Sequence, residues 1–65
     1  MIPSIGKPVW IRGAETGWRW IAATVAAHTK SGGRPAFVVD GQPGVFVDAH
    51  EGEFWTSQQP ETEGA

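Results

Sequence analysis

Cysteine and tyrosine are absent from this chain of 65 residues, and methionine occurs once. Without cysteine there is no disulfide to stabilise the fold, no thiolate to bind a metal ion and no thiol nucleophile. The absence also fits a reducing compartment, so we expect a cytoplasmic protein. A domain this short buries only about 60% of the surface that its unfolded chain exposes. Aromatic packing or self-association therefore has to supply much of its stability.

Long apolar runs are missing as well. The longest stretch without an ionisable side chain, Trp20–Ala27, has eight residues, whereas a membrane-spanning helix needs about 20. Residues 1–6 contain no basic segment followed by an apolar run, which is the pattern of a signal peptide. We therefore expect neither a signal peptide nor a membrane partner.

Neither sign of charge dominates, since the formal net charge is −2. Two of the seven acids, Glu61 and Glu63, lie in the polar end of the chain, which leaves five acids and five bases in the remainder. Binding to a phosphate backbone depends on clustered Lys and Arg. The balance of charge therefore argues against nucleic acid as the main partner.

Tryptophan, by contrast, is abundant. Four indoles are present, at Trp10, Trp18, Trp20 and Trp55. A domain of this size can bury one or two of them, so at least one is expected at the surface, where an indole can stack on a ligand or partner. This composition is typical of a binding module.

Glycine and proline divide the chain into short β-rich runs. Residues 1–6 are interpreted as an N-terminal arm, residues 7–56 as one domain, and residues 57–65, which hold no large apolar side chain, as a disordered tail. Alternating apolar residues between the turns predict four strands. These are Lys7–Arg12, Arg34–Val39, Val45–Asp48 and Glu53–Thr56.

The segment Trp18–Lys30 fits two structures. At helical spacing Trp18, Ile21 and Val25 share a face, and the glycines at 32 and 33 would end the helix. At a spacing of two, Ile21, Ala23 and Val25 point one way. The β-branched residues and the neighbouring strands favour a strand. We therefore predict an all-β, five-stranded small barrel, with an α+β fold carrying a helix at 18–31 as the alternative.

A resemblance to a known fold supports this interpretation. The run Gly17–Ala26, followed by a glycine turn and then Phe37–Gly41, resembles the core of Tudor-like and other SH3-like barrels in its aromatic, alanine, valine and turn positions. The resemblance covers roughly residues 7–56. It implies an SH3-like five-stranded barrel of a bacterial or phage type. The resemblance supports the prediction of the fold more than any prediction of function.

The predicted binding face follows from the alternation within the strands. Trp10 and Trp20 lie opposite the aliphatic residues on their strands and so point away from the expected core. Tryptophan and arginine most often dominate interface energies. We expect a face centred on Trp10 and Trp20 that binds a protein partner or another copy of the chain. Its members are Trp10, Arg12, Trp18, Arg19, Trp20 and Trp55.

The remaining polar residues predict turns rather than chemistry. The cluster Asp48–Glu51, which includes His50, is interpreted as a solvated turn rather than a metal or acid–base site. Asp40 is interpreted as a turn residue and Gly32–Arg34 as a hairpin rather than a phosphate cradle. We therefore expect no catalytic residue, no metal and no cofactor.

Two other functions remain open. In the first, the indoles stack on the bases of a nucleotide or nucleic acid. In the second, the chain is an oligomeric enzyme, because it is similar in length and presumed fold to the plasmid-borne dihydrofolate reductases, which assemble as tetramers around a shared pore. The Val-Gln-Ile-Tyr motif of that family is lacking, and the comparable strand here is Val45–Asp48.

Overall fold

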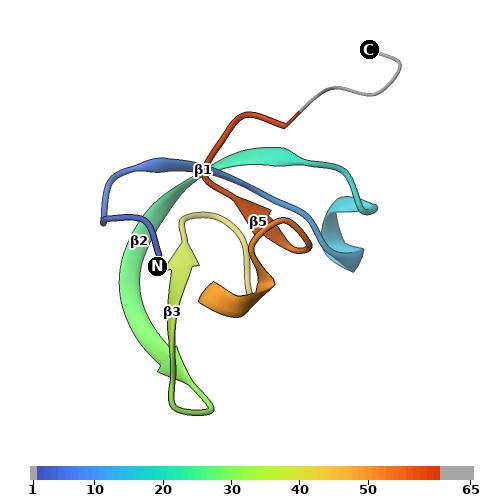
Figure 1. Cartoon of the computed structure of the whole chain (residues 1–65). Coiled ribbons are helices and arrows are strands. Elements are labelled where there is room, and N and C mark those ends of the chain that lie inside the picture. The colour runs from blue at the N-terminus through green and yellow to red at the C-terminus, as the bar shows by residue number, and fades with distance from the viewer. Residues whose placement is uncertain (1, 61–65) are drawn as a thin grey trace.

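The computed structural model describes residues 2–60, and the chain in this range is almost entirely strand, turn and loop (Figure 1). The described part contains five strands and two single-turn 3-10 helices. In chain order these are β1 (Pro8–Ile11), η1 (Ala14–Thr16), β2 (Ile21–Ser31), β3 (Arg34–Val39), β4 (Phe46–Val47), η2 (Asp48–His50) and β5 (Trp55–Thr56). None of the helices in residues 2–60 has the length and apolar character needed to cross a membrane.

The strands form one antiparallel sheet in the order β4-β3-β2-β1-β5. Strand β2 is shared by the two halves of this sheet. Its first residues, Ile21–Thr24, pair with β1, and its remainder, from Val25 to Ser31, pairs with β3. The register shifts between Val25 and Ala27, and an irregularity of this kind bends a strand and increases its twist. The curvature of β2 in Figure 1 wraps the two halves around a common interior.

The predicted all-β class is therefore confirmed, and the alternative helix at 18–31 is wrong. Pairing with strands on both sides overrides the helical propensity of the alanines in this segment. The strand begins at Ile21 rather than at Trp18, because Trp18 has a positive φ of 64°. The sheet is open, since no pairing between β4 and β5 occurs within residues 2–60.

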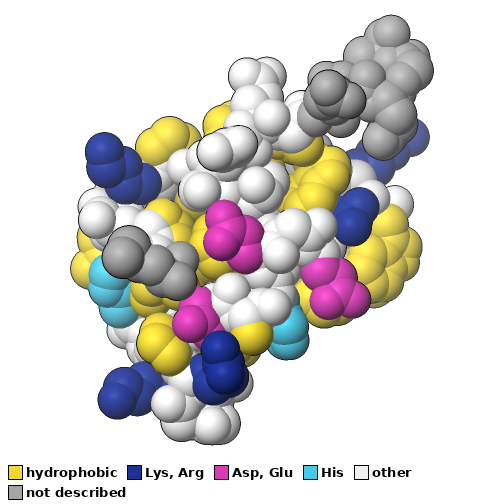
Figure 2. Space-filling view, viewed as in Figure 1, with side chains coloured by type: hydrophobic (Ala, Val, Ile, Leu, Met, Phe, Trp, Pro, Cys, Tyr) yellow, Lys and Arg dark blue, Asp and Glu magenta, His cyan; other side chains and the backbone are white. Residues whose placement is uncertain are grey.

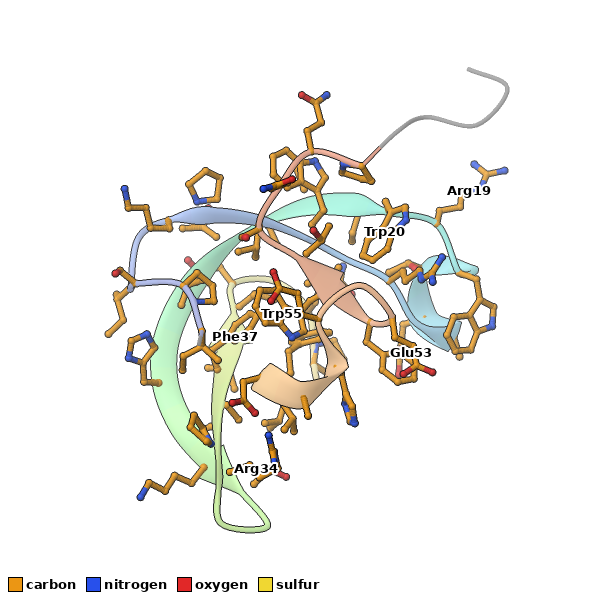
Figure 3. All side chains as sticks on the ribbon, viewed as in Figure 1. Arg19, Trp20, Arg34, Phe37, Glu53 and Trp55 are labelled. Carbon is orange, nitrogen blue, oxygen red and sulfur yellow. The ribbon has the colours of Figure 1, made fainter. Side chains whose placement is uncertain are left out.

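The core lies between the two halves of the sheet. Its buried members are Val9, Ile11, Val25, Phe37, Val39 and Trp55. The Trp55 ring meets Phe37 edge to face, with centroids 5.0 Å apart (Figure 3). Its indole N–H donates a 2.8 Å hydrogen bond to the backbone oxygen of Val47. This bond links β5 to β4 across the open side of the sheet.

Residues 3–7 lie along β2. The Gly6 N–H donates to the Val25 oxygen at 2.8 Å, and the Val25 N–H donates to the Lys7 oxygen at 3.0 Å. Farther along β2, His28 Nε2 lies 2.7 Å from the Pro3 oxygen. At the other end, residues 57–60 have no regular secondary structure. The rest of the predicted tail, residues 61–65, falls outside the described residues.

Candidate functional site

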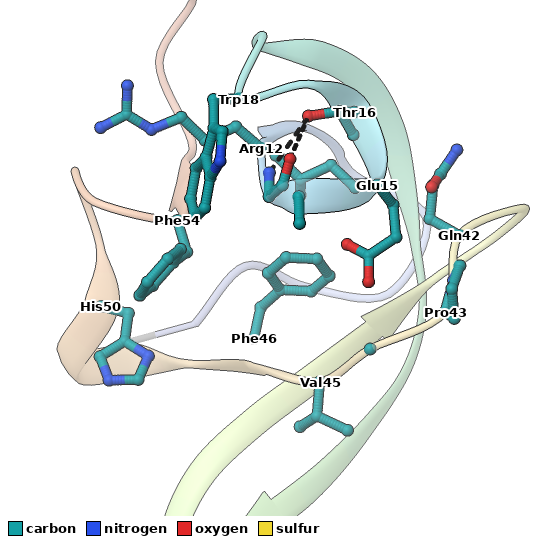
Figure 4. A pocket seen from close by; sticks show the side chains of 14 residues that line it. Arg12, Glu15, Thr16, Trp18, Gln42, Pro43, Val45, Phe46, His50 and Phe54 are labelled. Carbon is teal, nitrogen blue, oxygen red and sulfur yellow. Dashed lines mark hydrogen bonds between the residues drawn. The ribbon is translucent and has the colours of Figure 1, made fainter.

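A pocket of about 270 Å³ opens where three loops meet (Figure 4). The first is the β1–β2 loop, which contributes Glu15 and Trp18. The second is the end of the β3–β4 loop together with the start of β4, which contribute Val45 and Phe46. The third is the η2 turn and the residues after it, which contribute His50 and Phe54. These segments are far apart in the sequence and are brought together by the pairing of β1 with β5 and of β3 with β4.

Aromatic rings form much of the pocket wall. Trp18 and Phe54 have centroids 6.0 Å apart and are tilted by 40°. The His50 ring meets Phe54 edge to face at 5.3 Å. Phe46 stacks at 5.6 Å on Phe37 of the core. The wall is thus anchored in the interior at Phe46, whereas Trp18 at the rim is 57% exposed.

The position of Trp18 depends on the local structure of the β1–β2 loop. Thr16 Oγ1 accepts a hydrogen bond from the Gly13 N–H and lies within hydrogen-bond distance of the backbone oxygens of Gly13 and Arg19. The Trp18 N–H donates to the Gly13 oxygen at 2.9 Å. Gly17 and Trp18 both have left-handed backbones, with φ of 68° and 64°. For a bulky residue this is an unfavourable conformation, and the bonds around Thr16 hold it in place.

Glu15 is an acidic group of the pocket wall. In Figure 4 its carboxylate points inward, towards Phe46. A Cβ at Gly13 would lie 3.2 Å from Glu15 Oε1, a contact that the exposed Glu15 side chain can relieve by moving a few tenths of an ångström. Gly13 has an extended backbone with φ of −179°, a conformation that does not itself require glycine.

Arg12 also lines the pocket, but its charged group is engaged elsewhere. Arg12 Nε donates a 2.6 Å hydrogen bond to the backbone oxygen of Glu53, and the guanidinium carbon lies 4.5 Å from the centroid of the Trp20 ring. The Arg12 backbone N–H donates to the Phe54 oxygen at 3.0 Å. Arg12 thus fixes the turn that carries Phe54.

The residues of the predicted face are distributed over three places. One side of the β1–β2 pair carries Trp10, Arg12 and Trp20. The register pairs Trp10 with Ala22 and Ile11 with Ile21, so the next positions along, Arg12 and Trp20, face the same side as Trp10. Trp10 and Trp20 are half-buried there, and Arg19 is exposed beside Trp20. Trp18 lies in the pocket instead.

Trp55 does not belong to any surface of this kind. It is 1% exposed and packs against Phe37, so it is unable to stack on a partner. The Trp55 side chain faces the core, and its hydrogen bond to the Val47 oxygen satisfies the polar atom of the indole.

Of the residues that line the pocket, only Arg12 and Trp18 belong to the predicted face. Glu15, Phe46 and Phe54 were not identified from the sequence, and His50 was interpreted as part of a solvated turn. Phe46 and Phe54 each lie beside a glycine-containing turn, and that position is the signal that could have marked them. Their convergence with Trp18 depends on strand pairing, which the sequence alone does not reveal.

Charge is dispersed on the face shown in Figure 2, where basic side chains lie mainly towards the edges and acidic ones nearer the middle. An ion pair joins Arg34 Nε to Asp48 Oδ1 at 3.2 Å. Within residues 2–60 no group of three or more His, Cys, Asp or Glu side chains is placed to hold a metal ion. Comparison with protein-family models, curated proteins and solved structures finds no match to this chain.

Proposed function

We propose that this chain is a small, non-enzymatic, SH3-like binding module, and that it seats a side chain of a protein partner in the pocket between its loops. The observation that carries the proposal is the exposed Trp18 at the rim of a pocket whose other wall is anchored in the core. Exposed large apolar groups beside a concave site mark interaction surfaces. Val45, which is 48% exposed, is a second exposed apolar residue of the pocket lining.

The strand arrangement supports the SH3-like part of this proposal. A long β2 shared by two half-sheets and a short β5 beside β1 curl the sheet around one core. The Trp55 hydrogen bond then joins the two edge strands in place of backbone pairing. The lack of cysteine is compatible with a cytoplasmic location.

A displayed peptide library tests the function and requires no named partner. The chain is immobilised, and random peptides are selected on it. We expect the selected peptides to lose binding to Trp18→Ala and to keep binding to Trp10→Ala, the matched control on the opposite side of the sheet. Peptides that depend on Trp10 but not on Trp18 would place the binding site on the face predicted from the sequence, which is centred on Trp10 and Trp20. Selection of no peptide at all would overturn the proposal.

Light scattering on the free chain separates the two kinds of protein partner. A mass above that of one chain, lost in Trp18→Ala, means that the partner is another copy. A monomer at every concentration means that the partner is a different protein. Quenching of Trp18 fluorescence by nucleotides, with no peptide selected, would favour base stacking instead.

A further inference from the structure

We propose that the pocket accepts the guanidinium group of an arginine side chain from the partner, with Glu15 as the residue that selects it. This inference rests on the proposed function, because it names the chemistry of the same site. The observations that carry it are the charge that faces the pocket, the aromatic faces beside that charge, and the way this chain already holds an arginine of its own.

The charge facing the pocket is negative. Glu15 has neither a hydrogen-bond nor an ion-pair partner among residues 2–60, where the ion pair between Arg34 and Asp48 is the one present. In the described part of the chain, Arg12 is the only Lys or Arg of the lining, and its guanidinium is taken up by the Glu53 oxygen and the Trp20 ring. The Glu15 carboxylate is therefore available to bind a cation that enters the pocket.

The aromatic walls of the pocket also favour a positively charged ligand. The face of an aromatic ring carries negative potential and attracts a cation within about 6 Å of the ring centroid, with tryptophan the strongest. Trp18 and Phe54 lie beside each other at the rim, and Phe46 forms the floor near Glu15 (Figure 4). A neutral aliphatic side chain would use the rings but would leave the carboxylate facing apolar atoms.

The shape of the cation decides between arginine and lysine. A lysine ammonium is compact and strongly hydrated, and it needs several acceptors to replace its water. A guanidinium is flat, less strongly hydrated, and able to place one face on a ring while two N–H groups bind a carboxylate. The pocket offers flat aromatic rings and a single carboxylate, and this combination suits a guanidinium group better than an ammonium group.

Arg12 shows that this chain binds a guanidinium in the same manner. It stacks over Trp20 and donates from its edge to a backbone oxygen. The pocket repeats the arrangement with Trp18 or Phe54 as the ring and Glu15 as the acceptor, and in this case the arginine comes from outside. The partner we infer is a protein segment that presents an exposed arginine.

The experiment compares N-acetyl-arginine amide with N-acetyl-citrulline amide, which has nearly the same shape without the charge. Each is titrated into the ¹⁵N-labelled chain, and binding is followed at the indole N–H of Trp18 and the backbone N–H groups of Glu15 and Gly44. We expect the arginine amide to bind at least about five-fold more tightly than the citrulline amide. Glu15→Gln should remove that difference, and Glu51→Gln, an exposed acid outside the pocket, should keep it.

Three results would overturn the inference. One is equal binding of the arginine and citrulline amides, which would make the pocket merely apolar. Another is tighter binding of N-acetyl-lysine amide or of its trimethylated form, which would assign a different cation. The third is no response at the pocket from any amide. If library peptides still require Trp18 in these cases, only the arginine assignment fails. If none does, the proposed function fails with it.

Discussion

The guanidinium of Arg12 stacks 4.5 Å above the ring of Trp20, and this contact ties together the two ends of the β1–β2 loop. The same side chain donates to the Glu53 oxygen, so it also reaches the turn before β5. One residue outside the core therefore fixes the relative position of the loop that carries Trp18 and the turn that carries Phe54. The shape of the pocket depends on it.

Arg12→Lys tests this role. Lysine keeps the charge but loses both the flat face and the Nε donor, so we expect a loss of about 1 kcal/mol in the free energy of unfolding. For a chain of this size the melting temperature should fall by about 4–8 °C. Arg19→Lys is the control, because Arg19 is exposed and its side chain makes no hydrogen bond within residues 2–60. Equal melting temperatures for the two variants would contradict the role of Arg12.

The energetic cost of the left-handed backbone at residue 18 can be measured by comparing Trp18→Gly with Trp18→Ala. Both remove the indole, and they differ in the cost of a left-handed backbone, which is about 1 kcal/mol or more for alanine and absent for glycine. We expect chemical denaturation to show the glycine variant as the more stable of the two by about that amount. A more stable alanine variant would mean that residue 18 abandons its positive φ once the indole is gone.

Trp55 and Trp10 should respond very differently to truncation. Trp55→Ala removes a fully buried ring and should cost about 3–5 kcal/mol, enough to unfold a domain this small. Trp10 is half-buried on the outer side of β1, so Trp10→Ala should remain folded at 25 °C. Near-UV circular dichroism measures both. An unfolded Trp10→Ala would show that the outer face is part of the stabilising core.

The end of the chain provides a further test. Residues 61–65 hold no large apolar side chain, so they can bury little surface. A chain that ends at Pro60 should therefore keep the melting temperature of the full chain. A fall of more than about 5 °C, roughly 1 kcal/mol at this size, would show that these residues dock on the domain.

The all-β class was predictable because the alternation of apolar residues and the glycine turns are local signals. The start of β2 was not, since the positive φ of Trp18 is held by the bond from its N–H to the Gly13 oxygen, in a loop that Thr16 ties to Gly13 and Arg19, rather than by the identity of the residue. The site was predictable only in part. Trp18 and Arg12 were identified as surface groups, whereas Glu15 and Phe54 acquire their role from strand pairing between distant segments.

The two outermost strands, β4 and β5, are each only two residues long. A strand added to such an edge would find few free backbone groups to pair with, so neither edge offers a template for edge-to-edge aggregation. The same shortness limits the capture of an extended peptide through main-chain hydrogen bonds at β4 and β5. For the proposed binding module, this places more of the recognition on loop side chains, where single substitutions would change the ligand.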